Sequence, residues 1–228
     1  SVATVSSAGL VTAVADGTAT IIALSESANA TAVVTVAQVA STVELSPSTK
    51  TLASIGDTVT VSPTVKDAGG TVIPGTTVTW LSSDTTVATV SSAGLVIAVA
   101  DGTATITGTS GSASATAAVT VAQVASTVEI SPSTSTLEFV GDTVTLSATV
   151  KDAGGTVISG ATVTWTTSDA TIATVSSAGL VTAVADGTAT IAGTSGSASA
   201  TAAVTVAQVA STVELSPTTN TLESLGDT

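Results

Sequence analysis

An 85-residue period is the feature of this sequence that most limits what it can fold into. The segment STVELSP begins at Ser41, returns as STVEISP at Ser126 and returns once more at Ser211. A second segment, VATVSSAGLVTAVADGTATI, begins at Val2 and recurs with the same spacing. Because self-similarity at a fixed period marks repeated structural units, the chain is predicted to fold as a series of similar domains.

The two full copies are identical at 70 of 85 aligned positions, so we expect them to share one fold. Since the flanking segments match parts of the same unit, we expect the chain to be a stretch of a longer tandem array. The predicted domains are the C-terminal part of a repeat at 1–40, complete repeats at 41–125 and 126–210, and the N-terminal start of a further repeat at 211–228.

The residue composition predicts an all-β protein. Thr, Val and Ile make up 93 of the 228 residues, and β-branched side chains favour strands over helices. Period-two alternation, interrupted by turns rich in Gly, Asp and Ser, predicts about seven strands in each repeat. In the first full repeat these are 42–46, 58–66, 76–82, 86–90, 95–100, 103–109 and 114–122.

Alternation also assigns the faces of these strands. Thr faces water, and the inward set consists of apolar residues, namely Val59, Val61, Val65, Val78, Trp80, Ala104, Ile106, Val119 and Val121. Seven short strands, frequent turn signals and a lone Trp per repeat are typical of two packed antiparallel sheets of the immunoglobulin type. The chain has no Cys, so each sandwich is predicted to form without a disulfide.

Charge and residue usage exclude several classes of function. The net charge of −13 repels nucleic acid and anionic membrane surfaces. No apolar run approaches the roughly 18 residues of a membrane span, so we expect no membrane insertion in this segment. His and Cys are absent, which removes the usual catalytic bases, nucleophiles and metal ligands. We therefore expect no enzyme activity, no catalytic residue and no cofactor.

The repeat resembles the bacterial immunoglobulin-like group 2 family, whose modules occur in tandem in intimin- and invasin-like surface adhesins. The resemblance is carried by STVELSPS, by GDTVTVSPTVKDAGGTVIPGTTVTW and by SSDTTVATVSSAGLVIAVADGTATIT. The second full repeat departs from the motif with Thr166-Thr167-Ser168-Asp169. This resemblance implies a β-sandwich module on a bacterial surface, secreted or phage virion protein, and it implies no catalytic residue.

Carboxylates are the main candidate site residues. Eight aspartates fall in predicted turns, where Asp is favoured because it bonds the local backbone. Calcium between modules is the alternative, since it prefers hard oxygen ligands. The aspartates are Asp57, Asp67, Asp84, Asp101, Asp142, Asp152, Asp169 and Asp186, and the glutamates nearest the domain junctions are Glu44, Glu129 and Glu214.

Other candidates concern covalent bonds and ligand contacts. An intramolecular Thr–Gln ester would have to use Gln123 or Gln208, which otherwise end the last strand of a repeat. Asn29 lies in the one N-glycosylation pattern of the chain. A glycan- or receptor-binding module would need exposed aromatic anchors, and the chain offers only Trp80, Trp165 and Phe139.

The segments that join the repeats predict a mechanical role. They contain no Gly or Pro, unlike a flexible tether, so Val124 and Val209 are predicted to pack against the neighbouring domain and restrict bending. The function expected from the sequence is a spacer or stalk in an extracellular or cell-surface adhesin or fibre. Its partners would be neighbouring modules of the same chain. The alternatives are a filament or sheath subunit that binds copies of itself, and a glycan- or receptor-binding module.

Overall fold

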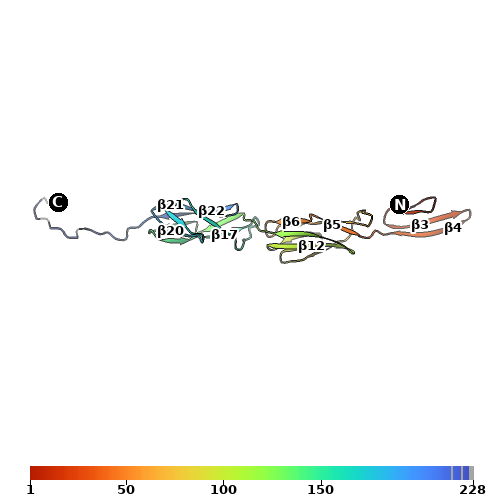
Figure 1. The fold of residues 1–228 in the computed structure, drawn as a ribbon, viewed down its shortest axis with the longest axis horizontal. Coiled ribbons are helices and arrows are strands. Elements are labelled where there is room, and N and C mark those ends of the chain that lie inside the picture. The colour runs from red at the N-terminus through yellow and green to blue at the C-terminus, as the bar shows by residue number, and fades with distance from the viewer. Residues whose placement is uncertain (217, 222, 226–228) are drawn as a thin grey trace. The chain divides into compact units, whose positions relative to one another are not determined.

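The computed structural model describes residues 1–216, 218–221 and 223–225, and every regular element among them is a β-strand (Figure 1). No helix capable of crossing a membrane is therefore found in this part of the chain. The chain forms two compact units, Ser1–Gln123 and Val124–Thr228, which are described in turn.

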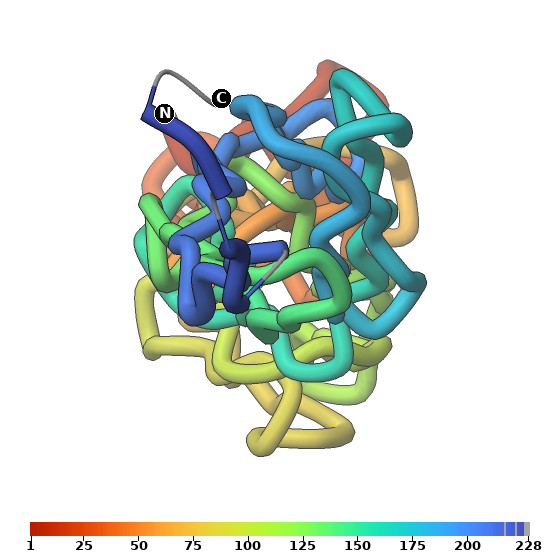
Figure 2. The backbone as a smooth tube through the Cα atoms, turned by 90° about the vertical axis from the view of Figure 1, so that its left-hand side faces the viewer, coloured from red at the N-terminus to blue at the C-terminus, as the bar shows by residue number. Residues whose placement is uncertain are grey.

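The first unit contains the first full repeat, whose strands form two layers. One layer is a four-stranded sheet in the order β6-β13-β12-β9, and the other contains the pair β5-β8 and the sheet β10-β11-β7. The strands are β5 (Thr42–Ser46), β6 (Thr49–Leu52), β7 (Thr58–Thr60), β8 (Ser62–Lys66), β9 (Thr79–Ser82), β10 (Ala88–Val90), β11 (Leu95–Ala98), β12 (Gly102–Ser110) and β13 (Ala113–Val121). The connections between successive strands are short except for residues 67–78 between β8 and β9. Figure 2 shows the backbone as a tube, turned by 90° from the view of Figure 1.

The structure differs from the predicted strands in two places. Strand β6 was not predicted, because its four residues contain a single apolar side chain and it is held by parallel pairing with the distant β13. The predicted strand 58–66 is divided at Val61, whose backbone N–H donates to the carbonyl of Gly94 at 2.9 Å. On one side of Val61 the chain pairs with β11, and on the other side it pairs with β5.

The core of the first full repeat lies between the two layers. Val61, Val96, Ala104 and Ile106 are each 0% exposed. Trp80 is half-buried and packs against this cluster. All nine residues predicted to face inward are buried or partly buried, so the alternation assigned the faces correctly. A smaller cluster around Val43 and Val65 continues the core towards the start of the repeat.

The second unit repeats this arrangement. Its sheets run β15-β22-β21-β18, β16-β20-β19 and β14-β17, matching the first full repeat strand for strand. The strands are β14 (Thr127–Ser131), β15 (Thr134–Leu137), β16 (Thr143–Thr145), β17 (Ser147–Lys151), β18 (Thr164–Thr167), β19 (Ala173–Val175), β20 (Leu180–Ala183), β21 (Gly187–Ser195) and β22 (Ala198–Val206). Leu146, Val181 and Ile191 lie at its centre.

Residues 1–36 form the same strands as the second half of a full repeat but with a less buried interior. Strands β1 (Ala3–Val5) and β2 (Val11–Ala13) pair with each other, as do β3 (Gly17–Ser25) and β4 (Ala28–Val36). Ile21 is only partly buried, whereas the equivalent Ile106 is fully buried. The hairpins therefore follow from the local sequence, while the closed core depends on the other half of a repeat.

The chain after β22 contains the predicted start of a further repeat, 211–228. Of the residues described there, none lies in a strand, and Glu214 is exposed. Residues 217, 222 and 226–228 of this predicted domain lie outside the described residues.

Candidate functional site

The turn aspartates bond the backbone, as the sequence predicted. In every case a side-chain carboxylate oxygen accepts a backbone N–H from a residue in a turn or at a strand end. The donors are Ala53 and Ser54 to Asp57, Gly69 and Thr71 to Asp67, Thr86 to Asp84, Gln123 to Asp101, Glu138 and Phe139 to Asp142, Thr156 to Asp152, Thr171 to Asp169, and Gln208 to Asp186.

Asp84 and Asp169 occupy the same turn in the two full repeats, and each accepts a short hydrogen bond from a threonine hydroxyl. The hydroxyl of Thr86 donates to Asp84 Oδ1 at 2.6 Å, and the hydroxyl of Thr171 donates to Asp169 Oδ1 at 2.6 Å. These hydroxyl donors, followed by the backbone N–H of the same threonines, hold the pKa of both carboxyls below the ordinary aspartate value.

This contact gives a prediction for the pH titration of Asp84. Replacing Thr86 by Val removes the hydroxyl and keeps the shape, so the pKa of Asp84 should rise towards its ordinary value. Because the folded pKa is lowered, the turn stabilises the fold above the ordinary aspartate pKa and loses this effect as the pH falls through the lowered value. Carboxyl ¹³C shifts measured by NMR against pH report the change, and Asp169 in the same spectrum is the internal control. An unchanged Asp84 midpoint would contradict the assignment.

The glutamates near the repeat junctions form ion pairs within their own repeat. Lys66 Nζ lies 2.7 Å from Glu44 Oε1, and Lys151 Nζ lies 2.7 Å from Glu129 Oε1. Each pair bridges adjacent antiparallel strands, and the glutamate side chains are 61% exposed. Such exposed pairs contribute little to stability. They connect strands within a repeat.

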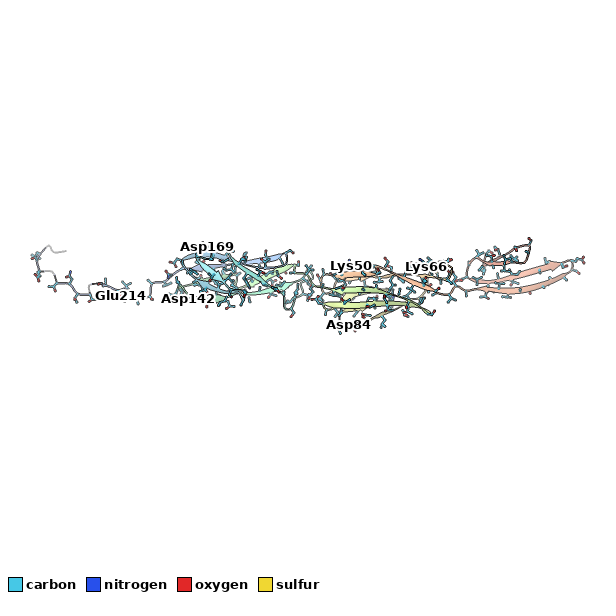
Figure 3. All side chains as sticks on the ribbon, in the orientation of Figure 1. Lys50, Lys66, Asp84, Asp142, Asp169 and Glu214 are labelled. Atoms are coloured by element: carbon cyan, nitrogen blue, oxygen red, sulfur yellow. The ribbon has the colours of Figure 1, made fainter. Side chains whose placement is uncertain are left out.

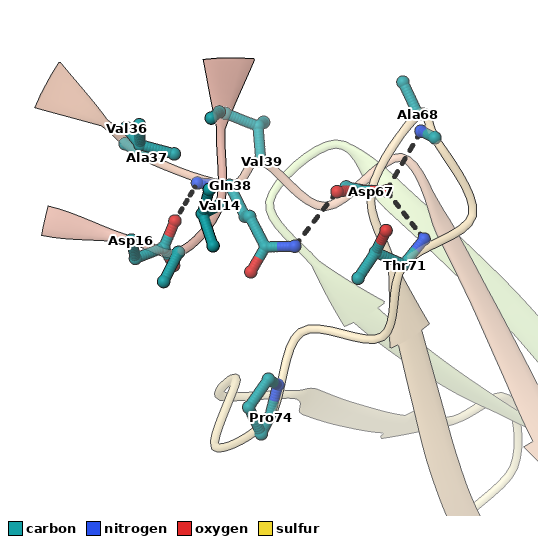
Figure 4. A pocket seen from close by; sticks show the side chains of 13 residues that line it. Val14, Asp16, Val36, Ala37, Gln38, Val39, Asp67, Ala68, Thr71 and Pro74 are labelled. Carbon is teal, nitrogen blue, oxygen red and sulfur yellow. Dashed lines mark hydrogen bonds between the residues drawn. The ribbon is translucent and has the colours of Figure 1, made fainter. Parts of the chain in front are cut away.

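A recess of the first unit lies where residues 1–40 meet the first full repeat. It is a groove of about 690 Å³ whose walls include Val14, Val36 and Val39 on one side and the loop after β8 on the other. Gln38 crosses it (Figure 4). The backbone N–H of Gln38 donates to Asp16 Oδ1 at 2.8 Å, and its side-chain Nε2 donates to Asp67 Oδ2 at 3.0 Å.

Asp67 is held in place from its own side of the groove. Its Oδ1 accepts the backbone N–H of Gly69 at 2.9 Å and that of Thr71 at 2.8 Å, while Oδ2 remains for Gln38. The Gln38 side chain is the largest cause of a lowered pKa at Asp67, followed by the backbone N–H of Thr71. The carboxylate is thus kept charged and aimed at the glutamine.

The valine of the first junction is not covered by the neighbouring repeat. Val39, the equivalent of Val124 and Val209, is 72% exposed. That Val124 and Val209 pack against a neighbouring domain stays a prediction. An apolar residue in a short connector can face the groove without being covered, and the side-chain contact at this junction comes from the preceding residue, Gln38.

Sequence reasoning missed the Gln38–Asp67 pair. The signal was present, because Gln recurs at 38, 123 and 208 and Asp recurs at 67 and 152 with the 85-residue period. These glutamines were considered as ester partners or strand ends. Gln123 and Gln208 follow the ends of β13 and β22, and their backbone N–H groups donate to Asp101 and Asp186.

The remaining candidates are dispersed. Lys50, Lys66 and Asp84 lie at separate places on the first unit (Figure 3). Among the described residues, no three acidic side chains gather in a way that could hold a metal ion. Asn29 is exposed on β4. A shallow hollow of about 360 Å³ beside half-buried Trp165 is lined mainly by apolar side chains such as Leu146, Ala148 and Val163, together with the hydroxyls of Thr145, Ser147 and Ser177.

The two-layer topology, with a mixed four-stranded sheet packed on a second layer, is that of an immunoglobulin-like β-sandwich. The family model described as "Bacterial Ig-like domain (group 2)" matches residues 1–36, 39–121 and 124–206. The chain belongs to this family, and it carries its domains in tandem. Both the predicted fold class and the resemblance noted in the sequence are confirmed. A search of curated protein sequences finds no significant match.

A search of solved structures matches several surface proteins. The surface layer protein SbsC, domains 1–6, is 20% identical with a TM-score of 0.37, and the match covers 91% of this chain and 37% of that one. The Escherichia coli adhesin FdeC is 21% identical with a TM-score of 0.42, covering 84% and 74%. Invasin, a bacterial integrin-binding protein, is 18% identical with a TM-score of 0.46, covering 87% and 47%. This chain therefore spans less than half the length of the SbsC and invasin chains.

Proposed function

We propose that this chain is a spacer segment of an extracellular or cell-surface protein, and that it acts through the length and stiffness of its tandem sandwiches. The observation that carries the proposal is the side-chain contact at the first junction, where the connector itself is hydrogen-bonded on both sides by Asp16 and Asp67. A connector held in this way does not behave as a free tether, for which a Gly/Ser-rich composition would be expected.

The chemistry of the repeats supports a mechanical role over a catalytic one. Their turn aspartates bond the backbone, and Lys66 and Lys151 form exposed ion pairs between strands. These contacts pair no nucleophile with a base. Tension along a repeat would load the parallel pairing of β6 with β13, because β6 lies near the start of the repeat and β13 is its last strand. Many hydrogen bonds that break together resist force better than bonds that break one by one.

Removal of one period tests the spacer function. Nine-residue strands span about 30 Å, and their end loops bring a module to about 40 Å. Deleting residues 41–125 keeps the register of the repeats, so the maximum dimension from small-angle X-ray scattering should fall by about 40 Å. In a flexibly jointed chain the dimension grows only with the square root of length, and the decrease would be markedly smaller. That smaller decrease would contradict the proposal.

Self-assembly into a filament or sheath is the second candidate. The net charge of −13 makes copies of the chain repel one another, whereas β6 and β9 form the edges of the four-stranded sheet and offer backbone groups for pairing. Sedimentation velocity over a wide range of protein concentration separates the two functions. A spacer remains monomeric, and a filament subunit forms larger species as its concentration rises.

A further inference from the structure

We propose that the Gln38–Asp67 hydrogen bond is a latch that fixes the angle between one repeat and the next. The inference rests on the proposed spacer function and deepens it, because it names the interaction surface that makes a junction stiff. The surface is the loop after β8, which presents Asp67, and the partner it fits is the terminal glutamine of the preceding repeat.

Each partner of the latch is held in place by hydrogen bonds within its own repeat. Gln38 is anchored through its backbone N–H to Asp16, a residue of the turn between β2 and β3 in its own repeat. Asp67 is anchored through Oδ1 to the N–H groups of Gly69 and Thr71 in its own loop. The Nε2–Oδ2 contact at 3.0 Å therefore joins two rigid turns, and it cannot persist if the repeats rotate freely.

The geometry also explains why Gln is suited to this position. The side-chain amide supplies an N–H donor without adding charge, and Oδ2 of Asp67 is an acceptor. A hydrogen bond to an ionised carboxylate is stronger than one between neutral groups. Glutamate at position 38 would keep the same shape but replace the donor by an oxygen and place like charges together. Lysine would restore a donor to the carboxylate.

The backbone of the connector provides a second restraint next to the latch. Ser41 N–H donates to the carbonyl of Lys66 at 2.8 Å, which extends the β5–β8 pairing to the residue at which the full repeat begins. Only residues 39 and 40 separate this backbone bond from Gln38. The connector is therefore held at both ends, by the Ser41–Lys66 backbone bond and by the Gln38–Asp67 latch. Loss of the latch would leave only the backbone bond to restrain the angle between the two repeats.

The sequence contains no Cys, so two introduced cysteines would be the only sites at which a spin label can attach. In the full chain, Thr18→Cys on β3 and Ser114→Cys on β13 place spin labels at exposed positions on either side of the junction. Double electron–electron resonance gives the distribution of distances between the labels. The variants are Gln38→Glu, Gln38→Lys and Asp67→Ala, each in this labelled chain.

We expect a narrow distribution for the parent chain and for Gln38→Lys. Loss of a hydrogen bond to a charged group should raise the population of open junctions about ten-fold, so Gln38→Glu and Asp67→Ala should give broad distributions. Gln208→Glu is the matched control, since it makes the same change at the equivalent position outside the labelled junction and should leave the width unchanged. Circular dichroism of each variant verifies that the strands remain folded.

The outcomes separate the latch from the spacer function. A narrow parent distribution that stays narrow in Gln38→Glu and Asp67→Ala would overturn the latch and leave the spacer proposal standing. A parent distribution that is already broad would overturn both, because the hydrogen bond would then fail to hold the junction. Broadening in Gln38→Glu that is absent in Gln38→Lys and in Gln208→Glu supports the latch.

Discussion

Replacing Gly94 by Ala is expected to lower the free energy of unfolding of the first full repeat by about 3 kcal/mol. Gly94 has a φ of 78°, in the left-handed region that L side chains rarely adopt. A Cβ at this position would lie 2.4 Å from the carbonyl oxygen of Val61 and 3.0 Å from the Trp80 ring. The clash falls where Val61 N–H bonds the Gly94 carbonyl and the strand changes its pairing partner.

A matched variant separates the clash from the backbone conformation. Gly75 has a φ of 72°, and a Cβ there would meet nothing within 4 Å. Gly75→Ala should therefore lower the free energy of unfolding by about 1 kcal/mol, because alanine is disfavoured in the left-handed backbone conformation. Denaturant unfolding followed by Trp80 fluorescence in a Trp165→Phe background reports the first full repeat alone. Equal losses of stability in Gly94→Ala and Gly75→Ala would show that the clash with the Val61 carbonyl oxygen contributes nothing to the destabilisation.

Replacing Ile106 by Ala is expected to lower the free energy of unfolding of the same repeat by about 2–5 kcal/mol. Ile106 is 0% exposed and lies in the centre of the cluster formed by β12, β13 and the facing layer. Its removal takes away buried apolar contacts and leaves a cavity that a close-packed interior cannot fully fill. Ile106→Val removes one methylene and should cost about 1 kcal/mol. The Trp80 fluorescence measurement described above applies unchanged.

Ile97→Thr is the control for this core substitution. Ile97 is 39% exposed, and the second full repeat carries Thr at the equivalent position 182. The change should alter stability by no more than about 0.5 kcal/mol. If Ile97→Thr proved as damaging as Ile106→Ala, the assignment of the core to the inward face of β12 would be wrong.

Much of the fold follows from local patterns. The β12–β13 hairpin is visible in alternating Ala, Ile and Val against Thr, because a strand exposes its two faces in turn. Its hairpin turn has Gly111 at a φ of 60°, and glycine favours such a turn. The same local signal operates in residues 1–36, where β3 and β4 pair although their interior is only partly buried.

The candidate site was less visible in the sequence. The turn aspartates were predicted correctly because Asp bonds its own neighbouring backbone, which is a local rule. The Gln38–Asp67 pair joins residues 29 positions apart, and nothing in the local pattern ranks this glutamine above the exposed valine that follows it. The sequence predicts apolar contacts at Val124 and Val209, whereas the first junction carries a charge-assisted hydrogen bond.

The sequence by itself determined the 85-residue period, the all-β class, the inward and outward faces, and the shortage of residues that do chemistry. Each of these depends on composition or on residues close together in the chain. Only the tertiary structure decided that β6 pairs with β13, that the strand changes partner at Val61, and that Gln38 reaches Asp67. Those features depend on which distant segments come together, and a backbone or side-chain donor selects its acceptor only once folding has placed both within hydrogen-bonding distance.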